Sequence, residues 1–339
     1  MQQLTFTGPD ALEWRDVDEP RLHSDRAALV RPLAVATCDL DALIIAGASP
    51  FQPPFAIGHE CVAEILDVGD GVGSLQPGQL VSVPFQISCG ACEACAAGRT
   101  ANCSGVAFMS TYGFGPAVEQ WGGFLADVVS VPFAEHMLVP IPGGLEPAAV
   151  ASASDNLSDA WRAVGPALAE QPGADVLVVG GAGPGSIGLY AAGLAVALGA
   201  GSVMYVDADE RRRETAAKLG AGTLAETPRR LGPYSVTVDA SADPDGLALA
   251  LRSTAPDGVC TSTAIYFAEQ PPMPLLEMYT KGITFRTGRV NARDAMPHVI
   301  ELAASGALRP ELVTTAVVPW AQAPDALLER GWTKLVITR

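Results

Sequence analysis

At 339 residues, the chain exceeds the length that one hydrophobic core usually supports, so two domains of ordinary size are expected. A hydrophobic fraction of 49% allows sizeable cores, and a formal net charge of -16 without a basic cluster disfavours nucleic-acid and membrane-surface partners. The first residues, MQQLTFTGPDALEW, lack the basic start and apolar segment of a signal peptide, so we expect a cytoplasmic protein.

Two short motifs in the first sixty residues carry chemically versatile side chains. The mostly apolar run at 33–47, LAVATCDLDALIIAG, places Cys38 next to carboxylates, and the run that starts GHECVAEIL contains His59 and Glu60. An isolated cysteine of this kind is ordinarily a small core side chain, and a lone histidine is more often structural than catalytic. Neither motif predicts a site by itself.

Four of the seven cysteines lie within fifteen residues, in SCGACEACAAGRTANCSG. Cys89, Cys92, Cys95 and Cys103 are spaced C-x2-C-x2-C-x7-C, and four thiolates satisfy the tetrahedral coordination of zinc. An iron–sulfur cluster uses a similar ligand set, although the usual ferredoxin spacings differ. The lobe at about 85–105 therefore predicts a zinc site, and a site closed by four thiolates has no position for substrate and is structural.

Residues 174–212 show the pattern of a dinucleotide-binding unit: a strand at 176–179, a glycine-rich turn, a helix, and a strand that ends at Val206. The turn satisfies G-x-G-x-x-G and precedes a helix N-terminus, which suits the anionic pyrophosphate. Two earlier glycines leave the register of the individual glycines open by two or three residues. The residues expected to meet the cofactor are Gly181, Gly183, Gly185, Ser186, Ile187, Gly188, Asp207 and Arg212.

Asp207 follows the second strand, 19 residues beyond Gly188. Its carboxylate can accept hydrogen bonds from both ribose hydroxyls and would repel a 2′-phosphate, which favours NAD over NADP. Arg211 and Arg212 lie close enough to complicate that preference.

The sequence after the glycine-rich turn predicts further strands of the nucleotide domain and a short closing segment. YSVTVDASAD and DGVCTSTAIYF predict later strands of the same parallel sheet, and the apolar stretch 186–206 predicts a buried helix followed by a buried strand rather than a membrane span. After about residue 287 we expect one helix and a closing strand, KLVIT.

Together, the cysteine lobe, the GHE motif and the nucleotide fold resemble the zinc-dependent alcohol dehydrogenases of the medium-chain dehydrogenase/reductase superfamily. The resemblance covers essentially the whole chain and implies an α/β fold. It implies a GroES-like β-rich catalytic domain over 1–154, a Rossmann NAD-binding domain with a doubly wound parallel sheet over 155–287, and a return to the first domain over 288–339.

The resemblance also implies a second, catalytic zinc. In that family the ligands are a cysteine in C-x-x-D, the histidine of GHE and a residue before the Rossmann domain, which here are Cys38, His59 and Asp155. These three leave a fourth position open, as a catalytic zinc requires. Glu60 is expected to support the site or to exchange as a ligand. The catalytic zinc and the zinc of the cysteine lobe together give two zinc ions per chain.

The chain departs from the family where a proton relay is usual. Leu40 and Leu43 stand where the family has a hydroxyl and often a histidine, and neither can move a proton. The candidate substitutes are Asp39, Asp41, Ser154, Asn156 and an ordered water. Two further positions are of interest: Phe85 resembles the family's substrate-pocket aromatic but is equally a core residue, and Lys334 is a candidate for a pyrophosphate contact.

The resemblance therefore predicts an oxidoreductase that transfers hydride between an alcohol, or the corresponding aldehyde or ketone, and NAD. The alternatives are a reductase of an activated C=C or C=N bond, for which no alkoxide proton must leave, and a catalytically silent nucleotide-binding homologue. The expected partners are a small-molecule substrate and, from the family, a second or fourth copy of the chain in a homodimer or homotetramer.

Overall fold

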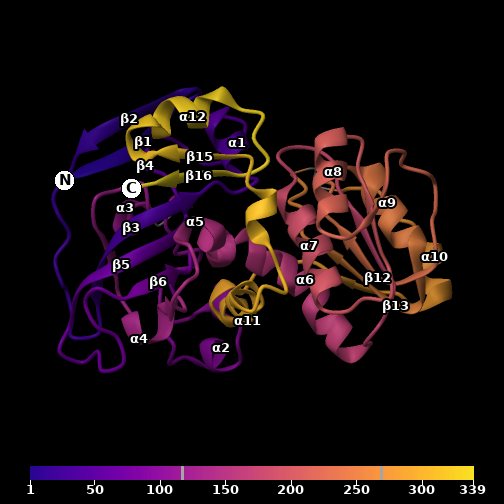
Figure 1. Ribbon diagram of the computed structural model, residues 1–339, viewed down its shortest axis with the longest axis horizontal. Helices are drawn as coiled ribbons and strands as arrows, with labels where there is room; N and C mark the ends of the chain where they lie inside the picture. Colours follow the sequence, from indigo (N-terminus) through magenta and orange to yellow (C-terminus); the bar gives the residue numbers. More distant parts are fainter. Residues whose placement is uncertain (116–117, 268–269) are drawn as a thin grey trace. The chain divides into compact units, whose positions relative to one another are not determined.

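The computed structural model describes residues 1–115, 118–267 and 270–339, and these form two compact units (Figure 1). Unit 1 comprises Met1–Ser158, Val290–Ala304 and Thr314–Arg339, and unit 2 comprises Asp159–Arg289 and Ser305–Val313. The sequence predicted that all residues after 287 return to the first domain, but Ser305–Val313 belong to unit 2. Its 3₁₀ helix η3 (Pro310–Val313) packs against helix α7 (Ser186–Ala197) of unit 2.

Unit 1 is built on a sheet in the order β15-β16-β3-β5-β6-β8, with β7 paired to β3. The long strands β3 (Ala28–Ala36) and β5 (Glu60–Val68) pair antiparallel, and β16 (Leu335–Thr338) pairs antiparallel with the other edge of β3 (Figure 1). The last residues of the chain are thereby fixed beside the first long strand. The remaining strands of this sheet are β6 (Leu80–Val83), β7 (Val129–Val131), β8 (Val139–Pro140) and β15 (Ala316–Pro319).

A smaller sheet in the order β2-β1-β4 completes the β-structure described in unit 1. Its strands are β1 (Gln2–Gly8), β2 (Ala11–Asp16) and β4 (Phe55–Ala56). Apolar side chains from both sheets share one core, which includes Leu4, Val35, Ile65 and Phe124. The β-rich unit 1 and the α/β unit 2 agree with the α/β fold expected from the sequence.

Short helices connect the strands of unit 1, so the unit is less purely β than the sequence predicted. They are α1 (Asp41–Ile45), α2 (Glu93–Ala96), α3 (Val118–Trp121), α4 (Ala134–Met137), α5 (Pro147–Val150), α11 (Ala292–Ala304), α12 (Ala323–Glu329), η1 (Thr100–Asn102), η2 (Ala151–Ser154) and η4 (Trp320–Gln322). The expectation of one helix after residue 287 was wrong, because both α11 and α12 lie there. Helix α12 was missed because seven residues give too short a pattern for an apolar period to show.

Unit 2 is a six-stranded parallel sheet in the order β11-β10-β9-β12-β13-β14. The strands are β9 (Val176–Val179), β10 (Val203–Val206), β11 (Gly222–Leu224), β12 (Tyr234–Asp239), β13 (Thr254–Ser262) and β14 (Thr284–Arg286). The order reverses between β9 and β12, and right-handed crossovers then place the connecting helices on opposite faces. In such sheets, ligands bind at the carboxyl ends of the strands beside the reversal.

Helix α7 and strand β10 occupy the apolar stretch 186–206, as the sequence predicted. Strand β9 is buried at all four positions, which explains why its sequence shows no alternation. Helix α6 (Asn156–Glu170) carries the chain from one unit to the next, and the other helices of unit 2 are α8 (Glu210–Lys218), α9 (Pro244–Ser253) and α10 (Leu275–Lys281). In the described part of the chain, the helices are too short or too polar to span a bilayer.

Candidate functional site

Three side chains from separate parts of unit 1 converge on one point. The ligand atoms of Cys38, His59 and Asp155 all lie within 4.8 Å of one another, and all three residues are buried. Cys38 precedes α1, His59 precedes β5, and Asp155 ends η2, so the fold brings together residues separated by more than one hundred positions. His59 Nε2 lies 3.4 Å from Asp155 Oδ2. Ligand atoms about 3.3 Å apart are what a tetrahedral zinc requires.

The imidazole of His59 gives the clearest indication that this cluster fits a cation. The side chain is fully buried, and neither ring nitrogen has a hydrogen-bond partner. Burial of a polar group without a hydrogen-bond partner costs folding free energy, and a metal ion bound to one ring nitrogen would remove that cost. Nε2 faces Asp155, while Nδ1 lies 3.5 Å from Asp41 Oδ1. Asp41 is therefore placed to orient the ring through Nδ1, the arrangement in which a carboxylate supports a metal-bound histidine.

Asp41 also fixes the thiol. Its Oδ2 accepts a 2.7 Å hydrogen bond from the backbone N–H of Cys38, so one carboxylate holds both Cys38 and His59. The backbone N–H of Leu40 lies 3.5 Å from Cys38 Sγ. The C-x-x-D spacing places a thiol and its supporting carboxylate on the same short turn.

The electrostatics of this cluster favour a cation. Burial raises the pKa of Cys38 well above its ordinary value, and Asp155, Asp41 and Glu60 raise it further. Burial lowers the pKa of His59, but the Asp41 and Asp155 carboxylates outweigh burial and raise it to about 9. A divalent ion would supply the positive charge that these acids otherwise draw from protons. The residues therefore fit a zinc ion.

Glu60 is engaged by a buried lysine. Its two oxygens lie 3.3 and 3.1 Å from Lys334 Nζ, and Oε1 also accepts a hydrogen bond from the backbone N–H of Asn156. Burial raises the pKa of Glu60 to about 7, although Lys334 lowers it. Lys334 is fully buried and also donates to the carbonyl oxygen of Thr37, so the expectation that it contacts pyrophosphate was wrong. No local pattern near either residue indicates this pair.

Aromatic rings form an apolar wall against His59. The Phe114 ring packs edge-on at 4.7 Å between centroids, and Phe85 lies 5.9 Å away. Phe85 and Phe114 stack on each other, and Phe51 contacts Phe114. Phe85 is thus both part of the core and a neighbour of the candidate ligand. Phe114 was missed, because a single phenylalanine in a glycine-rich stretch has no pattern around it.

The candidate substitutes for the proton relay fall into two groups. Asp41 is engaged with Cys38 and His59, and Ser154 Oγ accepts from the N–H of Cys61 and donates to the carbonyl of Ala151. By contrast, Asn156 Nδ2 lies 3.5 Å from Asp39 Oδ1, and Asp39 is partly exposed. The Asp39–Asn156 pair is therefore the one with a path toward solvent.

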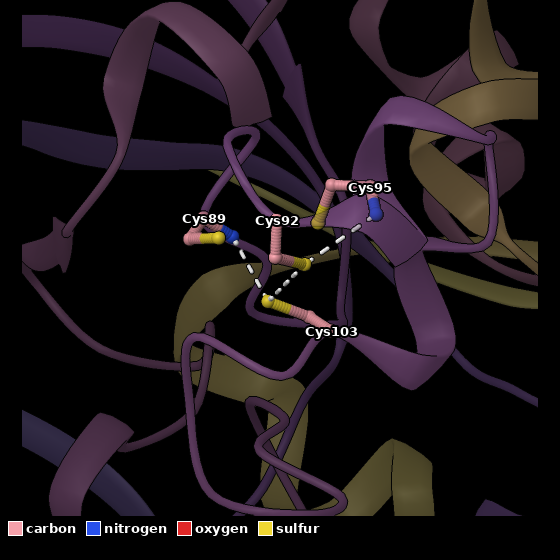
Figure 2. Close-up of side chains that lie close together, drawn as sticks. All are labelled: Cys89, Cys92, Cys95 and Cys103. Carbon is pink, nitrogen blue, oxygen red and sulfur yellow. Dashed lines mark hydrogen bonds between the residues drawn. The ribbon is translucent and has the colours of Figure 1, made fainter.

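The four lobe cysteines form the second candidate metal centre (Figure 2). Their sulfur atoms lie within 4.8 Å of one another, and none is in a disulfide. Cys92 Sγ and Cys103 Sγ are 3.9 Å apart, and Cys103 Sγ accepts hydrogen bonds from the N–H groups of Cys89 and Gly105. At Gly105 a Cβ atom would lie 2.6 Å from Cys89 Sγ, so only glycine allows this approach.

Thiolates in the lobe are supported by backbone amides. Hydrogen bonds from the backbone of Cys95 and Ser104 lower the pKa of Cys92 to about 5, whereas burial raises the pKa of Cys95 to about 12. Four sulfurs so close together repel one another once deprotonated, and a divalent ion removes that repulsion. The donor set therefore fits a zinc ion closed by four thiolates.

The lobe also anchors the chain where it re-enters unit 1. Buried Gln86 donates from Nε2 to the carbonyl of Val290 at 2.8 Å and accepts at Oε1 from the N–H of Ala292. Asn291 Oδ1 accepts a 3.0 Å hydrogen bond from the N–H of Ala101. Integrity of the lobe is thus coupled to the start of α11.

The glycine-rich turn lies at the carboxyl end of β9. Gly183 and Gly185 have φ of +75° and +77°, and Gly185 caps α7, which starts at Ser186. The backbone of Gly181 lies against Ser241, which follows β12. A Cβ atom at Gly188 would make ordinary 3.4 Å contacts, so the third glycine of the pattern has room for alanine. Ile187 is the second residue of α7. The turn and the positive end of α7 fit the pyrophosphate of a dinucleotide.

Asp207 lies directly after β10, beside this turn, and Arg212 reaches it from the first turn of α8. Arg212 Nε donates to Asp207 Oδ2 at 2.8 Å. The expected acid is therefore in place, but it is paired within the chain.

Comparisons with known proteins agree with these sites. The alcohol dehydrogenase GroES-like domain model matches residues 24–143, and the zinc-binding dehydrogenase model matches residues 186–305. The chain is 28% identical over 331 residues to a probable zinc-binding alcohol dehydrogenase of Mycobacterium tuberculosis, covering 95% of this chain and 83% of that protein. It is 33% identical over 248 residues to the L-threonine 3-dehydrogenase of Streptomyces coelicolor, covering 68% and 67% of the two chains.

A solved structure agrees over the full length. The alcohol dehydrogenase TADH from Thermus sp. ATN1 superposes with a TM-score of 0.88 at 29% identity, covering 100% of this chain and 99% of that chain. The two matched domain models, the relatives and this fold lead to one assignment. The chain belongs to the zinc-dependent alcohol dehydrogenase family of the medium-chain dehydrogenase/reductase superfamily and is an oxidoreductase of that superfamily.

Proposed function

We propose that the protein is a zinc-dependent alcohol dehydrogenase that uses NAD. The observation that carries this proposal is the convergence of Cys38, His59 and Asp155 around an imidazole whose buried nitrogens have no hydrogen-bond partner. Zinc bound there supplies a Lewis acid that lowers the pKa of an alcohol hydroxyl or polarises a carbonyl, and nicotinamide supplies the hydride chemistry. Among the relatives, L-threonine 3-dehydrogenase is named for oxidation of a hydroxyl-bearing substrate, which supports an alcohol.

The residues around the trio have distinct roles in this proposal. Asp41 orients His59 and the Cys38 turn, and Lys334 holds the Glu60 carboxylate. Phe85 and Phe114 keep one side of the imidazole apolar, which strengthens electrostatic interactions at the metal position. A proton released from the substrate would leave toward the partly exposed carboxylate of Asp39, which Asn156 Nδ2 contacts at 3.5 Å.

The experiment is an assay of NADH formation with a panel of primary and secondary alcohols and polyols, using the zinc-loaded protein. We expect oxidation of at least one alcohol class and a loss of about a thousandfold or more in His59→Gln, because the electrostatic contribution of the metal site is lost. His298→Gln is the matched control, since His298 is exposed on α11. Equal activity of His59→Gln and wild type would contradict the proposal.

The absence of a hydroxyl at positions 40 and 43 favours a second candidate, reduction of an activated C=C or C=N bond. Leu43 is 40% exposed and Leu40 is partly buried against the core, and neither carries a transferable proton. This reaction does not require an alkoxide proton to leave. Reduction of an activated alkene or imine by NADH with no oxidation of any alcohol would favour it.

We also propose that the protein self-associates through unit 2. Five large apolar side chains of its described residues are more than half exposed, and we call them the apolar patch of unit 2: Ile265, Phe267, Leu275, Leu276 and Tyr279. Three of them lie on α10, which directly precedes β14 in the chain. Strand β14 is the last strand of its sheet in the described chain. Exposed apolar side chains in a segment that leads into an open sheet edge are suited to another copy of the same edge, and two-fold pairing of identical edges gives a closed dimer.

A further inference from the structure

The carboxylate of Asp239, at the carboxyl end of β12, accepts hydrogen bonds from two segments of unit 2. Its side chain is fully buried. Oδ1 accepts from the backbone N–H of Ser241 at 3.1 Å and from the Ser241 hydroxyl at 2.6 Å. Oδ2 accepts from the hydroxyl of Ser262 at 2.7 Å and from the hydroxyl of Tyr266 at 2.9 Å. One carboxylate therefore holds the segments that follow the neighbouring strands β12 and β13.

The same cluster reaches the glycine-rich turn after β9. The carbonyl of Ser241 accepts a 2.9 Å hydrogen bond from the backbone N–H of Ala182, and the backbone of Gly181 lies against Ser241. Strand β9 pairs with β12 in the sheet. The segments after β9, β12 and β13 are thus joined through Asp239 and Ser241, at the edge of the sheet where ligands bind beside the reversal of strand order.

Tyr266 anchors the far end of the loop that follows β13, residues 263–267. Its ring packs against the apolar core of unit 2, and its hydroxyl donates to Asp239, with the carbonyl of Asp243 at 3.2 Å as an alternative acceptor. Burial and the Asp239 carboxylate raise the pKa of Tyr266, so the hydroxyl stays protonated and remains a donor. The neighbouring Ile265 and Phe267 are 56% and 55% exposed and carry no polar side-chain atom. The Tyr266 hydroxyl is therefore the side-chain polar group that ties this end of the loop to the sheet.

The near end of the loop is fixed independently of Tyr266. The backbone N–H of Thr263 donates to the carbonyl of Asp239 at 2.9 Å. Arg162 Nη2, on α6, donates to the carbonyl of Ser262 at 3.3 Å. Loss of the Tyr266 hydroxyl should therefore free the far end of the loop and leave the end of β13 in place.

The strand order gives the direction in which a dinucleotide lies on this unit. The pyrophosphate is expected at the turn after β9, and the adenosine end is expected toward β10, where Asp207 lies. Strands β10 and β12 flank β9 on opposite sides. The nicotinamide end then extends over the carboxyl ends of β12 and β13, where the loop 263–267 begins.

We propose that Tyr266 is a positioning residue for the nicotinamide end of the cofactor, because its hydrogen bond to Asp239 holds the loop 263–267 in the course that this end of the dinucleotide meets. This inference rests on the proposed nicotinamide-dependent function. Tyr266 acts through the loop and need not touch the cofactor itself. When a binding-competent arrangement is present only part of the time, the apparent affinity falls by that fraction.

The test is calorimetric titration of the zinc-loaded protein with NADH and with ADP, which carries the adenosine and two phosphates but no nicotinamide. For Tyr266→Phe we expect the dissociation constant of NADH to rise about tenfold, because the freed loop is ordered only part of the time. The dissociation constant of ADP should change by less than about twofold, because ADP does not reach the loop.

Tyr234→Phe is the matched control. Tyr234 packs against the same apolar core but begins β12, at the opposite end of the strand from Asp239. Loss of its hydroxyl should leave both dissociation constants within about twofold of wild type.

Hydrogen exchange of the wild-type protein provides a second measurement that requires no variant to fold. The segment 263–267 should exchange more slowly with NADH bound than with ADP bound. Equal exchange with the two ligands would overturn the inference, as would equal changes in the NADH and ADP constants of Tyr266→Phe, which indicate a purely structural role, or an unchanged NADH constant. Failure of the wild type to bind NADH would instead overturn the proposed function on which the inference rests.

Discussion

Lys334 Nζ lies 3.1 Å from Glu60 Oε2, and both side chains are fully buried. The pair joins the residue before the last strand to the residue after His59, across 274 positions of sequence. Two opposite charges that have lost their hydration depend on each other, since removal of one leaves the other uncompensated. The closing strand of the chain therefore supports the wall of the candidate active site.

Replacement of this lysine should destabilise the protein strongly. Lys334→Met leaves the Glu60 carboxylate buried without its cation, which should lower the free energy of unfolding by about 3–5 kcal/mol. Urea denaturation measures this change. Lys218→Met is the control, because Lys218 is exposed at the end of α8 and should change stability by about 0.5 kcal/mol or less. Similar midpoints for the two variants would show that the buried pair contributes nothing.

The pH dependence of the metal-free protein should report on His59. The pKa of this residue is raised from 6.5 to about 9 in the folded state, so its contribution is present below pH 6.5 and is lost as pH rises toward 9. The shift corresponds to about 3 kcal/mol. The difference in unfolding free energy between wild type and His59→Gln, measured after chelation at several pH values, isolates this residue. Zinc should flatten the difference, and a pH-independent difference without zinc would contradict the assignment.

The nucleotide unit was the part of the fold most accessible from sequence. Its strands are buried on both faces, so β9 and β10 read as short continuous apolar runs, and the glycine turn and Asp207 punctuate them. The Cys89–Cys103 spacing is equally local. These features were predictable because each depends on residues that are close together in the chain.

The missed features depend on contacts between distant segments. Nothing near Lys334 indicates that it pairs with Glu60, and nothing near Phe114 indicates that it packs on His59. The Asp207–Arg212 pair is local in sequence, but the further hydrogen bonds that Asp207 accepts from the hydroxyl of Tyr205 and the N–H of Asp209 become visible only when distances are known. Spacing identified the candidate ligands, and three-dimensional packing determined what supports them.

A hydroxyl at position 40 should improve alcohol oxidation. Leu40→Ser places a proton carrier where the family usually has one, and general acid–base groups of this kind contribute about a hundredfold or more. We expect a rise of about tenfold in kcat near neutral pH, since the site has not adapted to the new group. Leu40→Ala removes the same bulk without adding a hydroxyl. If serine and alanine have the same effect, the proton path does not run through this position.

Charge on the apolar patch of unit 2 should prevent self-association. Tyr279 is 86% exposed and Leu276 is 77% exposed, so Leu276→Glu with Tyr279→Glu should fold normally and yield monomers. Light scattering coupled to size exclusion measures the mass. Val317→Glu is the control, because Val317 is 56% exposed but lies on β15 of unit 1. An unchanged mass in the double variant would place the contact elsewhere.

Zinc stoichiometry tests the central claim most directly. Elemental analysis should give two zinc ions per chain in wild type and one in Cys38→Ala, with alcohol oxidation lost and the remaining zinc held by the cysteine lobe. Cys92→Ala should also lose one zinc, but from the lobe, with a loss of stability because the anchor on Val290 and Ala292 is weakened. Two zinc ions in Cys38→Ala, or one in wild type, would contradict the assignment of Cys38, His59 and Asp155 as a catalytic zinc site.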